Sequence, residues 1–345
     1  MQLYHRIIIT YGLILAVTAA AWIWAIEEFS GHPVLLGSAF LAYALGLRHA
    51  VDADHIAAID NVTRKLMQEG RQTVNAGFFF SLGHSSVVLL VSAAVVMTAG
   101  AFSGKFNAIS SFGSVLGTGI STVFLLVFGL INAVLFAQIY KTFKQVRETG
   151  IYSQEDLNHL LSQRGFLSRL FRRLFGLIRR SRQMFFIGFL FGLGFDTSTE
   201  VAMIGIAAAG ALKGMNLWSI MIFPVLFAAG MSLADTTDGV IMQGVYRWAF
   251  LTPVRKLYYN LAITGVSVAV ALAVAAIEAL GLLGGKLSLK GSFWNLIGAL
   301  NGDFNTIGLI TVGIFISAWA LSFLIYHFMR CDEVKPQHNF IRTST

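Results

Sequence analysis

Long apolar stretches constrain this 345-residue sequence more than any other feature. A helix needs roughly 20 mostly apolar residues to cross the hydrocarbon core of a bilayer. Hydrophobic residues make up 56% of the chain and charged residues 12%, whereas soluble domains carry about 25% charged residues. Because a barrel strand needs only about ten residues, these longer runs predict an all-α integral membrane protein, a polytopic bundle of about eight transmembrane helices. We place the spans at 7–26, 34–59, 75–99, 115–139, 184–212, 217–245, 259–284 and 306–328.

The positions of the basic residues predict how these helices are oriented. If the N-terminus is cytoplasmic, the C-terminus and the segments 60–74, 140–183 and 246–258 are cytoplasmic as well. Most of the 25 Lys and Arg residues then lie inside, as the positive-inside rule requires. The outside segments hold Lys105, Lys213, Lys286 and Lys290. The net charge of +8 therefore reflects topology and does not indicate nucleic-acid binding.

The segment 140–183 divides the chain into two groups of four spans. Residues 1–139 hold the first group, and residues 184–345 hold the second group and a short tail. Within the dividing segment, residues 164–182 carry leucine and phenylalanine on one helical face and arginine on the other. This pattern is typical of a helix that lies on an anionic membrane surface. A purely topological anchor without a regulatory role explains the same pattern.

Many ionisable residues lie inside the predicted spans. Each such group costs a few kcal/mol or more to insert, so it usually marks an ion pathway, a proton relay or a ligand site. The acidic members are Asp52, Asp54, Asp60, Asp196, Glu200, Asp235, Asp238 and Glu278, and the histidines are His49, His55 and His84. Asp60 and Glu278 lie near span ends, where we expect solvated or paired side chains. Because the chain has one cysteine, Cys331, a thiolate site is excluded.

The second span carries the densest group of these residues. On an ideal helix, His49, Asp52 and His55 fall within an arc of about 120°. Asp54 points away from that arc, and it could orient a histidine of another helix, pair with Arg48, or join the group if the helix is distorted. Two imidazoles and a carboxylate suit nickel, cobalt or zinc, whereas magnesium and calcium favour oxygen ligands. Any one of these histidines alone could equally be a hydrogen-bonded packing residue.

Three further spans add polar side chains at similar depth. His84 lies in the third span, the carboxylates of Asp196 and Glu200 stack at i and i+4 in the fifth, and Asp235 and Asp238 follow in the sixth. A metal site inside a helical bundle is built from such facing side chains. The candidate metal residues are thus His49, Asp52, Asp54, His55, His84, Asp196, Glu200, Asp235 and Asp238.

The sequence around these residues resembles the nickel/cobalt transporter family (NiCoT), the high-affinity nickel/cobalt permeases. The segment 48–56 reads Arg-His-Ala-Val-Asp-Ala-Asp-His-Ile and is similar to the family's signature, with its core at His49, Asp54 and His55. The segments 79–88, 193–200 and 230–239 resemble the family's further motifs, in order. The resemblance covers essentially the whole chain.

This resemblance implies an eight-span permease of the bacterial cytoplasmic (inner) membrane that imports Ni²⁺ or Co²⁺ as its substrate, without a separate cofactor. It also implies that both signature histidines and Asp54 are needed for transport. That role for Asp54 disagrees with the ideal-helix projection. Either the helix is broken near Ala53, or Asp54 acts from behind the metal ligands.

Several functions compete for this pattern. The chain lacks a G-x-x-x-x-G-K-[S/T] phosphate loop, so we expect a secondary transporter that is driven by the membrane potential, with proton coupling left open and no obligatory ATPase partner. A nickel or cobalt efflux permease is disfavoured because the 140–183 segment holds a single histidine, His159. A membrane subunit of a multi-component importer stays open. An intramembrane protease is disfavoured because no His-Glu-x-x-His motif occurs, and we expect no enzyme.

Overall fold

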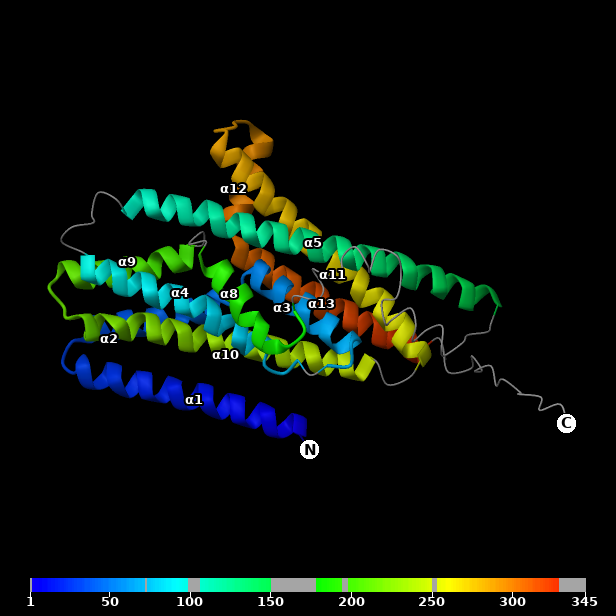
Figure 1. Cartoon of the computed structure of the whole chain (residues 1–345), viewed down its shortest axis with the longest axis horizontal. Helices are drawn as coiled ribbons and strands as arrows, with labels where there is room; N and C mark the ends of the chain where they lie inside the picture. Colours follow the sequence, from blue (N-terminus) through cyan, green and yellow to red (C-terminus); the bar gives the residue numbers. More distant parts are fainter. Residues whose placement is uncertain are drawn as a thin grey trace.

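The computed structural model describes residues 2–71, 73–98, 106–149, 178–193, 198–249 and 253–328. These residues form helices and short connections, and they contain no strand. In lipid a helix satisfies its backbone hydrogen bonds internally, which explains why the apolar runs become helices. The fold is that of a polytopic helical membrane protein, as the sequence predicts (Figure 1).

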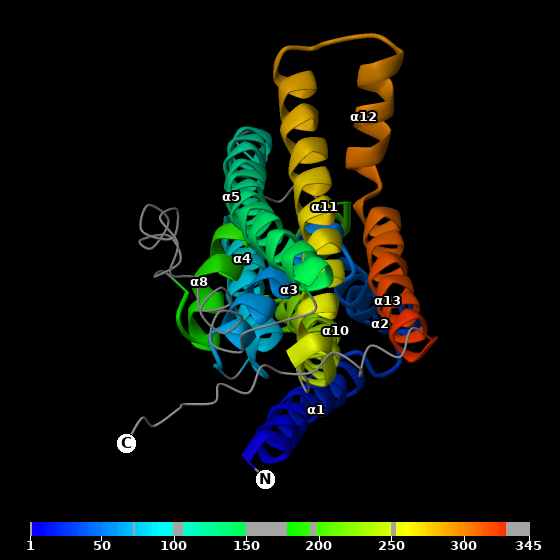
Figure 2. The same ribbon diagram turned by 90° about the vertical axis from the view of Figure 1, so that its right-hand side faces the viewer.

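The helices follow one another along the chain with short connections. They are α1 (Gln2–Glu28), α2 (Pro33–His49), α3 (Ala53–Gln68), α4 (Ala76–Thr98), α5 (Phe106–Thr149), the 3-10 helix η1 (Ser181–Gln183), α8 (Met184–Gly192), α9 (Ser198–Leu212), α10 (Leu217–Ala249), α11 (Pro253–Lys286), α12 (Ser292–Gly302) and α13 (Phe304–Phe328). Figure 2 shows the end of α11 and α12 projecting together beyond the rest of the bundle.

Not every predicted span is one straight helix. In the described part of the chain, α1, α4, α5, α10 and α11 are each long and apolar enough to cross a membrane. The pairs α2–α3 and α12–α13 are bent by 51° and 76°, and each pair is long enough for one span. The predicted span 184–212 consists of two short helices, α8 and α9, on either side of residues 194–197, which lie outside the described residues. The number of eight spans therefore stays a prediction.

The predicted span 34–59 is broken just before Ala53, which is one of the two alternatives that the sequence left open. Helix α2 ends at His49 and α3 begins at Ala53, with Asp52 in an extended conformation (φ −64°, ψ 146°) between them. Gly308 of α13 packs against this break, and a Cβ added there would lie 1.6 Å from the carbonyl oxygen of Val51. Helix α13 can therefore approach the break this closely only because residue 308 is a glycine and has no side chain.

The prediction of a loop at residues 60–74 is wrong over its first half. Helix α3 continues to Gln68, and Asp60, Arg64 and Lys65 are buried inside the bundle. Asp60 accepts hydrogen bonds from the hydroxyls of Tyr246 and Ser267. Buried charges are tolerated when they are paired and hydrogen-bonded, and here α10 and α11 supply the partners.

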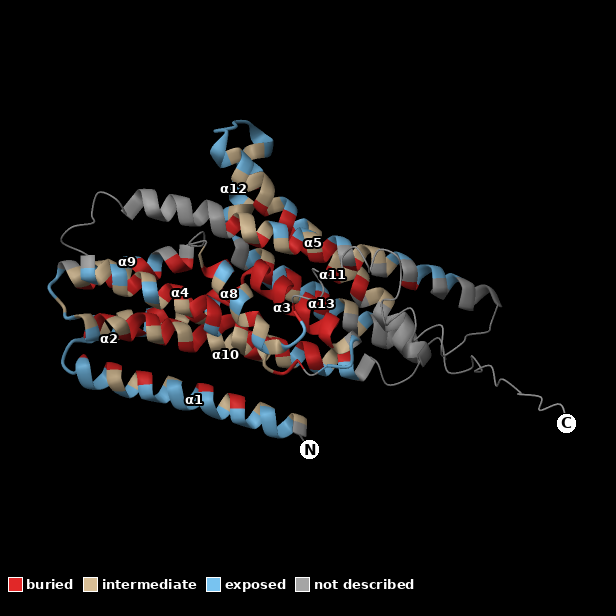
Figure 3. Ribbon diagram, in the orientation of Figure 1, coloured by how far each residue is buried: buried red, intermediate tan, exposed pale blue. Residues whose placement is uncertain are grey.

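Helix α10 is central to the bundle, where it contacts α1, α2, α3, α4, α9 and α11. Its contact with α2 is a close backbone approach. A Cβ added at Gly46 would lie 2.0 Å from the carbonyl oxygen of Phe227, and one at Gly230 would lie 2.5 Å from that of Tyr43. Small residues at helix interfaces let membrane helices approach in this way. Figure 3 shows the buried residues concentrated on α2, α3, α4 and α10, whereas α1 is exposed along most of its surface.

We expect Gly46→Ala to destabilise the bundle, because the added methyl group overlaps the backbone of Phe227. Overpacking of this kind costs about 1–3 kcal/mol. Thermal unfolding of the purified protein in detergent should show a lower melting temperature. Gly37→Ala on the same helix is the matched control, since nothing lies within 4 Å of its Cβ position. Equal melting temperatures for both variants would contradict the close contact.

Candidate metal site

Three histidines meet in the interior of the bundle, although they come from three helices. His49 ends α2, His55 lies in α3, and His84 lies in α4. One ring nitrogen of each lies within 4.8 Å of the others, and the exposed fractions of the three residues are 1%, 0% and 2%. Such burial of three imidazoles inside a membrane bundle indicates a ligand site more than a packing arrangement.

The break in the second span brings His49 and His55 together. On a continuous helix, residues six positions apart are separated by about 9 Å along the axis. The bend between α2 and α3 instead places the two ring centroids 4.6 Å apart, at an interplanar angle of 67°. His49 and His55 therefore come together because the helix is broken between them, and not because they share one face of a continuous helix.

His49 has a different partner on each ring nitrogen. Its Nδ1 lies 3.0 Å from Asp52 Oδ2 and 3.0 Å from Thr199 Oγ1. When the Asp52 carboxyl group is ionised it can only accept, so the ring hydrogen then lies on Nδ1 and Nε2 carries the lone pair. That Nε2 lies 3.0 Å from Nε2 of His84. Asp52 thus points His49 toward the centre of the group.

Glu200 completes this side of the site. Its Oε1 lies 2.8 Å from Nε2 of His84 and 3.9 Å from Nε2 of His49. Glu200 is in the first turn of α9 and is 1% exposed. One ring nitrogen, His49 Nε2, and one carboxylate oxygen, Glu200 Oε1, therefore lie within hydrogen-bonding distance of His84 Nε2.

His55 approaches from α3 and is oriented by α10. Its Nδ1 lies 3.3 Å from both carboxylate oxygens of Asp235, and Asp235 in turn accepts a 2.6 Å hydrogen bond from the Ser81 hydroxyl. Within the described residues, the buried Nε2 of His55 has no hydrogen-bond partner. A buried lone pair of this kind, aimed by a carboxylate behind the ring, is the arrangement found for metal-binding histidines.

The distances suit a divalent transition metal. Two ligand atoms about 2.1 Å from a metal ion and at right angles to each other lie about 3.0 Å apart. His49 Nε2 and His84 Nε2 have a separation of that size. Three imidazoles and a carboxylate form a nitrogen-rich ligand set, which suits nickel, cobalt or zinc and does not suit magnesium or calcium.

Comparisons with known proteins show which family the chain belongs to. The family model described as high-affinity nickel-transport protein matches residues 35–325. The chain belongs to this family. It is 52% identical to the high-affinity nickel transport protein of Cupriavidus necator over 328 residues, which cover 95% of this chain and 93% of that protein. No solved structure matches the chain significantly.

Other relatives in this nickel-transport family carry related names. The chain is 48% identical to the hydrogenase nickel incorporation protein HupN of Bradyrhizobium diazoefficiens, over 92% of this chain and 83% of that protein. It is 37% identical to the cobalt transport protein NhlF of Rhodococcus rhodochrous, over 90% of this chain and 88% of that protein. The family and these relatives are transport proteins, so the chain is a transport protein and not an enzyme.

The structure describes some of the remaining candidate residues of this family member and not others. Asp54 is buried in the first turn of α3. Asp238 lies one turn beyond Asp235 on α10, and its Oδ2 is buried without a hydrogen-bond partner in the described residues. Asp196 falls on residues 194–197, outside the described part of the chain. Glu278 is buried and accepts hydrogen bonds from Ser121 and Thr122, so it is paired and not solvated.

Sequence reasoning missed two features of the site. Thr199, which contacts His49, precedes Glu200 in a Thr-Ser-Thr-Glu run, and that run of hydroxyls was the available signal. Aromatic rings also surround the histidines: Phe80 lies 4.8 Å from His55 and Phe227 lies 5.6 Å from His49, measured between ring centroids. No spacing in the sequence could have assigned these two phenylalanines among the 29.

We expect Asp235→Asn to weaken metal binding, because the variant loses the negative charge that holds the Nδ1 hydrogen of His55. Removal of such a supporting carboxylate typically costs about 10–100-fold in metal affinity. Equilibrium dialysis of the purified chain with Ni²⁺ measures this change. The exposed Asp303→Asn is the matched control. Unchanged affinity in Asp235→Asn would show that Asp235 does not support a ligand.

Proposed function

We propose that this chain imports Ni²⁺ or Co²⁺ across the bacterial cytoplasmic membrane as a secondary transporter. The observation that carries the proposal is the convergence of His49, His55 and His84 on one buried point beside Glu200. The names of the relatives from Cupriavidus necator and Rhodococcus rhodochrous, for nickel and cobalt transport, support the same substrates. Nickel and cobalt accept the same nitrogen and oxygen ligands, so both belong to the proposal.

The candidate residues divide into two proposed roles. His49, His55, His84 and Glu200 replace part of the hydration shell of the ion. Asp52 and Asp235 hold the two histidines in place from behind. Asp54 and Asp238 are further candidate ligands on the ion's path, Asp196 stays a candidate from the sequence alone, and the family resemblance makes Asp54 necessary for transport.

Charge compensation supports a divalent cation as the cargo. Glu200, Asp52 and Asp235 bring three carboxylates against the imidazoles, and all three are less than 4% exposed. Carboxylates buried in a membrane bundle are costly unless a positive charge offsets them. A bound Ni²⁺ or Co²⁺ ion offsets two of these charges and takes the lone pairs of the ring nitrogens.

The membrane potential is sufficient to drive uptake. Moving two positive charges inward is favourable by about 4.6 kcal/mol per 100 mV, from about 2.3 kcal/mol per charge, which corresponds to more than a thousandfold accumulation. A metal that binds Nε2 of His84 replaces the hydrogen that this nitrogen donates to Glu200. That hydrogen either moves to Nδ1 of His84, which has no hydrogen-bond partner in the described residues, or leaves as a proton, so coupling to protons stays open.

The proposal also includes a topology. Both termini are cytoplasmic, residues 1–139 and 184–345 form two groups of spans, and the basic helix at 164–182 lies on the anionic cytoplasmic leaflet. Residues 164–177 fall outside the described part of the chain, and over residues 178–180 the prediction of a helix is wrong, because Arg180 is extended (φ −146°, ψ 146°) just before η1. No ATPase partner takes part, because the potential alone supplies the driving force.

The decisive test is accumulation of radiolabelled nickel and cobalt by cells that express this chain alone. We expect uptake to fall by at least about tenfold in the double variant His49→Ala/His55→Ala, since two of the metal ligands are lost. His5→Ala/His32→Ala is the matched control because both of these histidines are exposed. Membrane abundance of all chains is measured in parallel.

Each other outcome has a defined meaning. Normal uptake by the His49→Ala/His55→Ala variant would overturn the site. Lower cellular metal with the intact chain would assign efflux instead of import. Uptake that requires a separate ATPase would make the chain a subunit of a multi-component importer.

A further inference from the structure

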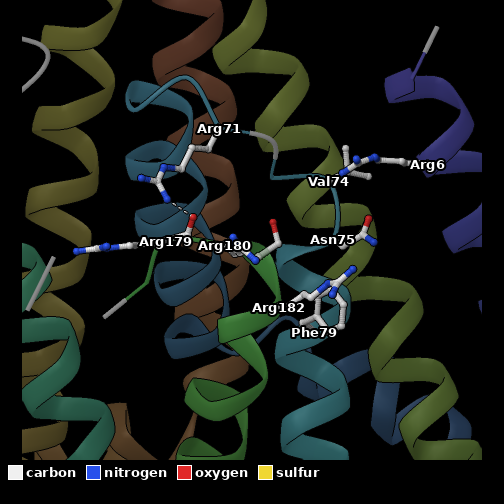
Figure 4. A pocket seen from close by; sticks show the side chains of 9 residues that line it. Arg6, Arg71, Val74, Asn75, Phe79, Arg179, Arg180 and Arg182 are labelled. Carbon is white, nitrogen blue, oxygen red and sulfur yellow. Dashed lines mark hydrogen bonds between the residues drawn. The ribbon is translucent and has the colours of Figure 1, made fainter. Parts of the chain in front are cut away.

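A second polar feature of the chain lies away from the metal site. A cavity of about 750 Å³ opens where α1, the connection between α3 and α4, and the segment before α8 come together. Nine residues line it, and five of them are arginines: Arg6, Arg71, Arg179, Arg180 and Arg182. None of the nine is acidic. Figure 4 shows Arg6 reaching toward Val74, Arg182 beside Phe79, and Asn75 between them in this view.

The cavity wall is held together by hydrogen bonds. The guanidinium of Arg71 donates to the carbonyl oxygen of Arg179 (2.5 Å) and its Nε pairs with Glu69 (3.0 Å). The side-chain oxygen of Gln183 accepts from the backbone N–H groups of Arg179 and Arg180 at 2.6 and 2.9 Å. The arginine-bearing segment is therefore fixed in shape before any ligand arrives, which lowers the entropy cost of binding.

Within the described residues, the positive charge in this cavity exceeds the negative charge that lines it. Glu69 pairs with Arg71, but it is not among the residues that line the cavity. Helices α4 and α8 also begin here, directly after Asn75 and Gln183, and the N-terminal end of a helix carries partial positive charge. A guanidinium group can donate two parallel hydrogen bonds to two oxygens of one phosphate. A phosphate ester is therefore the ligand that suits this group of arginines best.

Apolar stripes lead from the cavity along two helices. On α1, Ile9 and Leu13 follow Arg6 at three and seven positions, on the same helical face, and are 56% and 51% exposed. On α8, Phe186 and Leu190 follow Arg182 at four and eight positions and are 67% and 38% exposed. A ligand with a phosphate head and long apolar chains would contact both the arginines and these stripes.

We propose that this cavity binds the phosphate headgroup of an anionic phospholipid, whose acyl chains lie along α1 and α8. A free phosphate ion has the same chemistry as the headgroup, but it would make no contact with the exposed apolar residues of α1 and α8. The site is separate from the metal site, because the residues that line the cavity do not include His49, His55 or His84. A run of basic residues in the sequence would attract anionic lipids in a general way. This cavity is different, because Arg6 and Arg71 lie far from Arg182 in the sequence and line the same cavity only in the folded chain.

The test uses the purified full chain in detergent and native mass spectrometry to count retained lipid molecules. We expect Arg6→Gln/Arg182→Gln to retain phosphatidylglycerol at least about tenfold more weakly than the unmodified chain, since each basic residue near an anionic lipid contributes several-fold to binding. Lys141→Gln/Arg247→Gln removes the same charge from exposed positions outside the cavity and should bind as the unmodified chain does. Phosphatidylcholine retention should be weak and equal in all three chains.

Two further arms separate the possible ligands. Inorganic phosphate should not displace phosphatidylglycerol at about 1 mM, because phosphate alone lacks the apolar contacts. Phe186→Ser/Leu190→Ser should weaken lipid retention and keep all five arginines. If inorganic phosphate competes efficiently and the Phe186→Ser/Leu190→Ser variant binds normally, the lipid assignment is wrong.

Folding is controlled within the same experiment. Arg6→Lys/Arg182→Lys keeps both charges without the planar guanidinium fork, and it should restore part of the lost binding. An equal loss of phosphatidylglycerol in the Lys141→Gln/Arg247→Gln control would overturn the cavity as a specific site. Metal uptake by each variant, measured beside the His49→Ala/His55→Ala chain, distinguishes failure of the lipid site from failure of the transport proposal.

Discussion

Hydrogen bonds between buried histidines and carboxylates decide which helices of this protein meet. Each histidine of the site has a carboxylate partner: Asp52 for His49, Asp235 for His55 and Glu200 for His84. Ionisable groups inside a membrane are stable only when paired, so these contacts tie α2, α3, α4, α9 and α10 to one point. The apolar surface alone gives no such specificity, because lipid chains solvate leucine as well as a neighbouring helix does.

The sequence predicts the helices well where a span is regular. The spans placed at 75–99 and 217–245 correspond to α4 (Ala76–Thr98) and α10 (Leu217–Ala249), because an apolar run in lipid has only one way to satisfy its backbone. The sequence offered a break near Ala53 as one of two alternatives, but it could not decide between them. Residues 50–52 contain neither proline nor glycine, and the bend depends on Gly308, more than 250 positions away, and on the Asp52–His49 contact.

The composition of the site was predictable, but the role of each residue depends on the break. The sequence predicts His49, His55, His84 and Glu200 as site residues because each is an ionisable group in an apolar run. An ideal-helix projection puts Asp52 on the face of the two histidines and Asp54 away from it. In the structure Asp52 precedes α3 in an extended conformation, makes no side-chain capping hydrogen bond, and contacts Nδ1 of His49. The contact between Asp52 and His49 thus agrees with the projection, but it is made across a helix break.

Helix α3 also couples the metal site to a second buried polar cluster. His55 and Asp60 are five residues apart, or about 7.5 Å along the helix axis. Asp60 is held by Tyr246 of α10 and Ser267 of α11, and Arg64 donates to Thr264 of α11 and to Asn61. A movement of α3 that changes the position of His55 and leaves α10 and α11 in place would therefore strain or break these buried hydrogen bonds. Because leaving a buried charge without its partner is costly, we expect α3, α10 and α11 to move together.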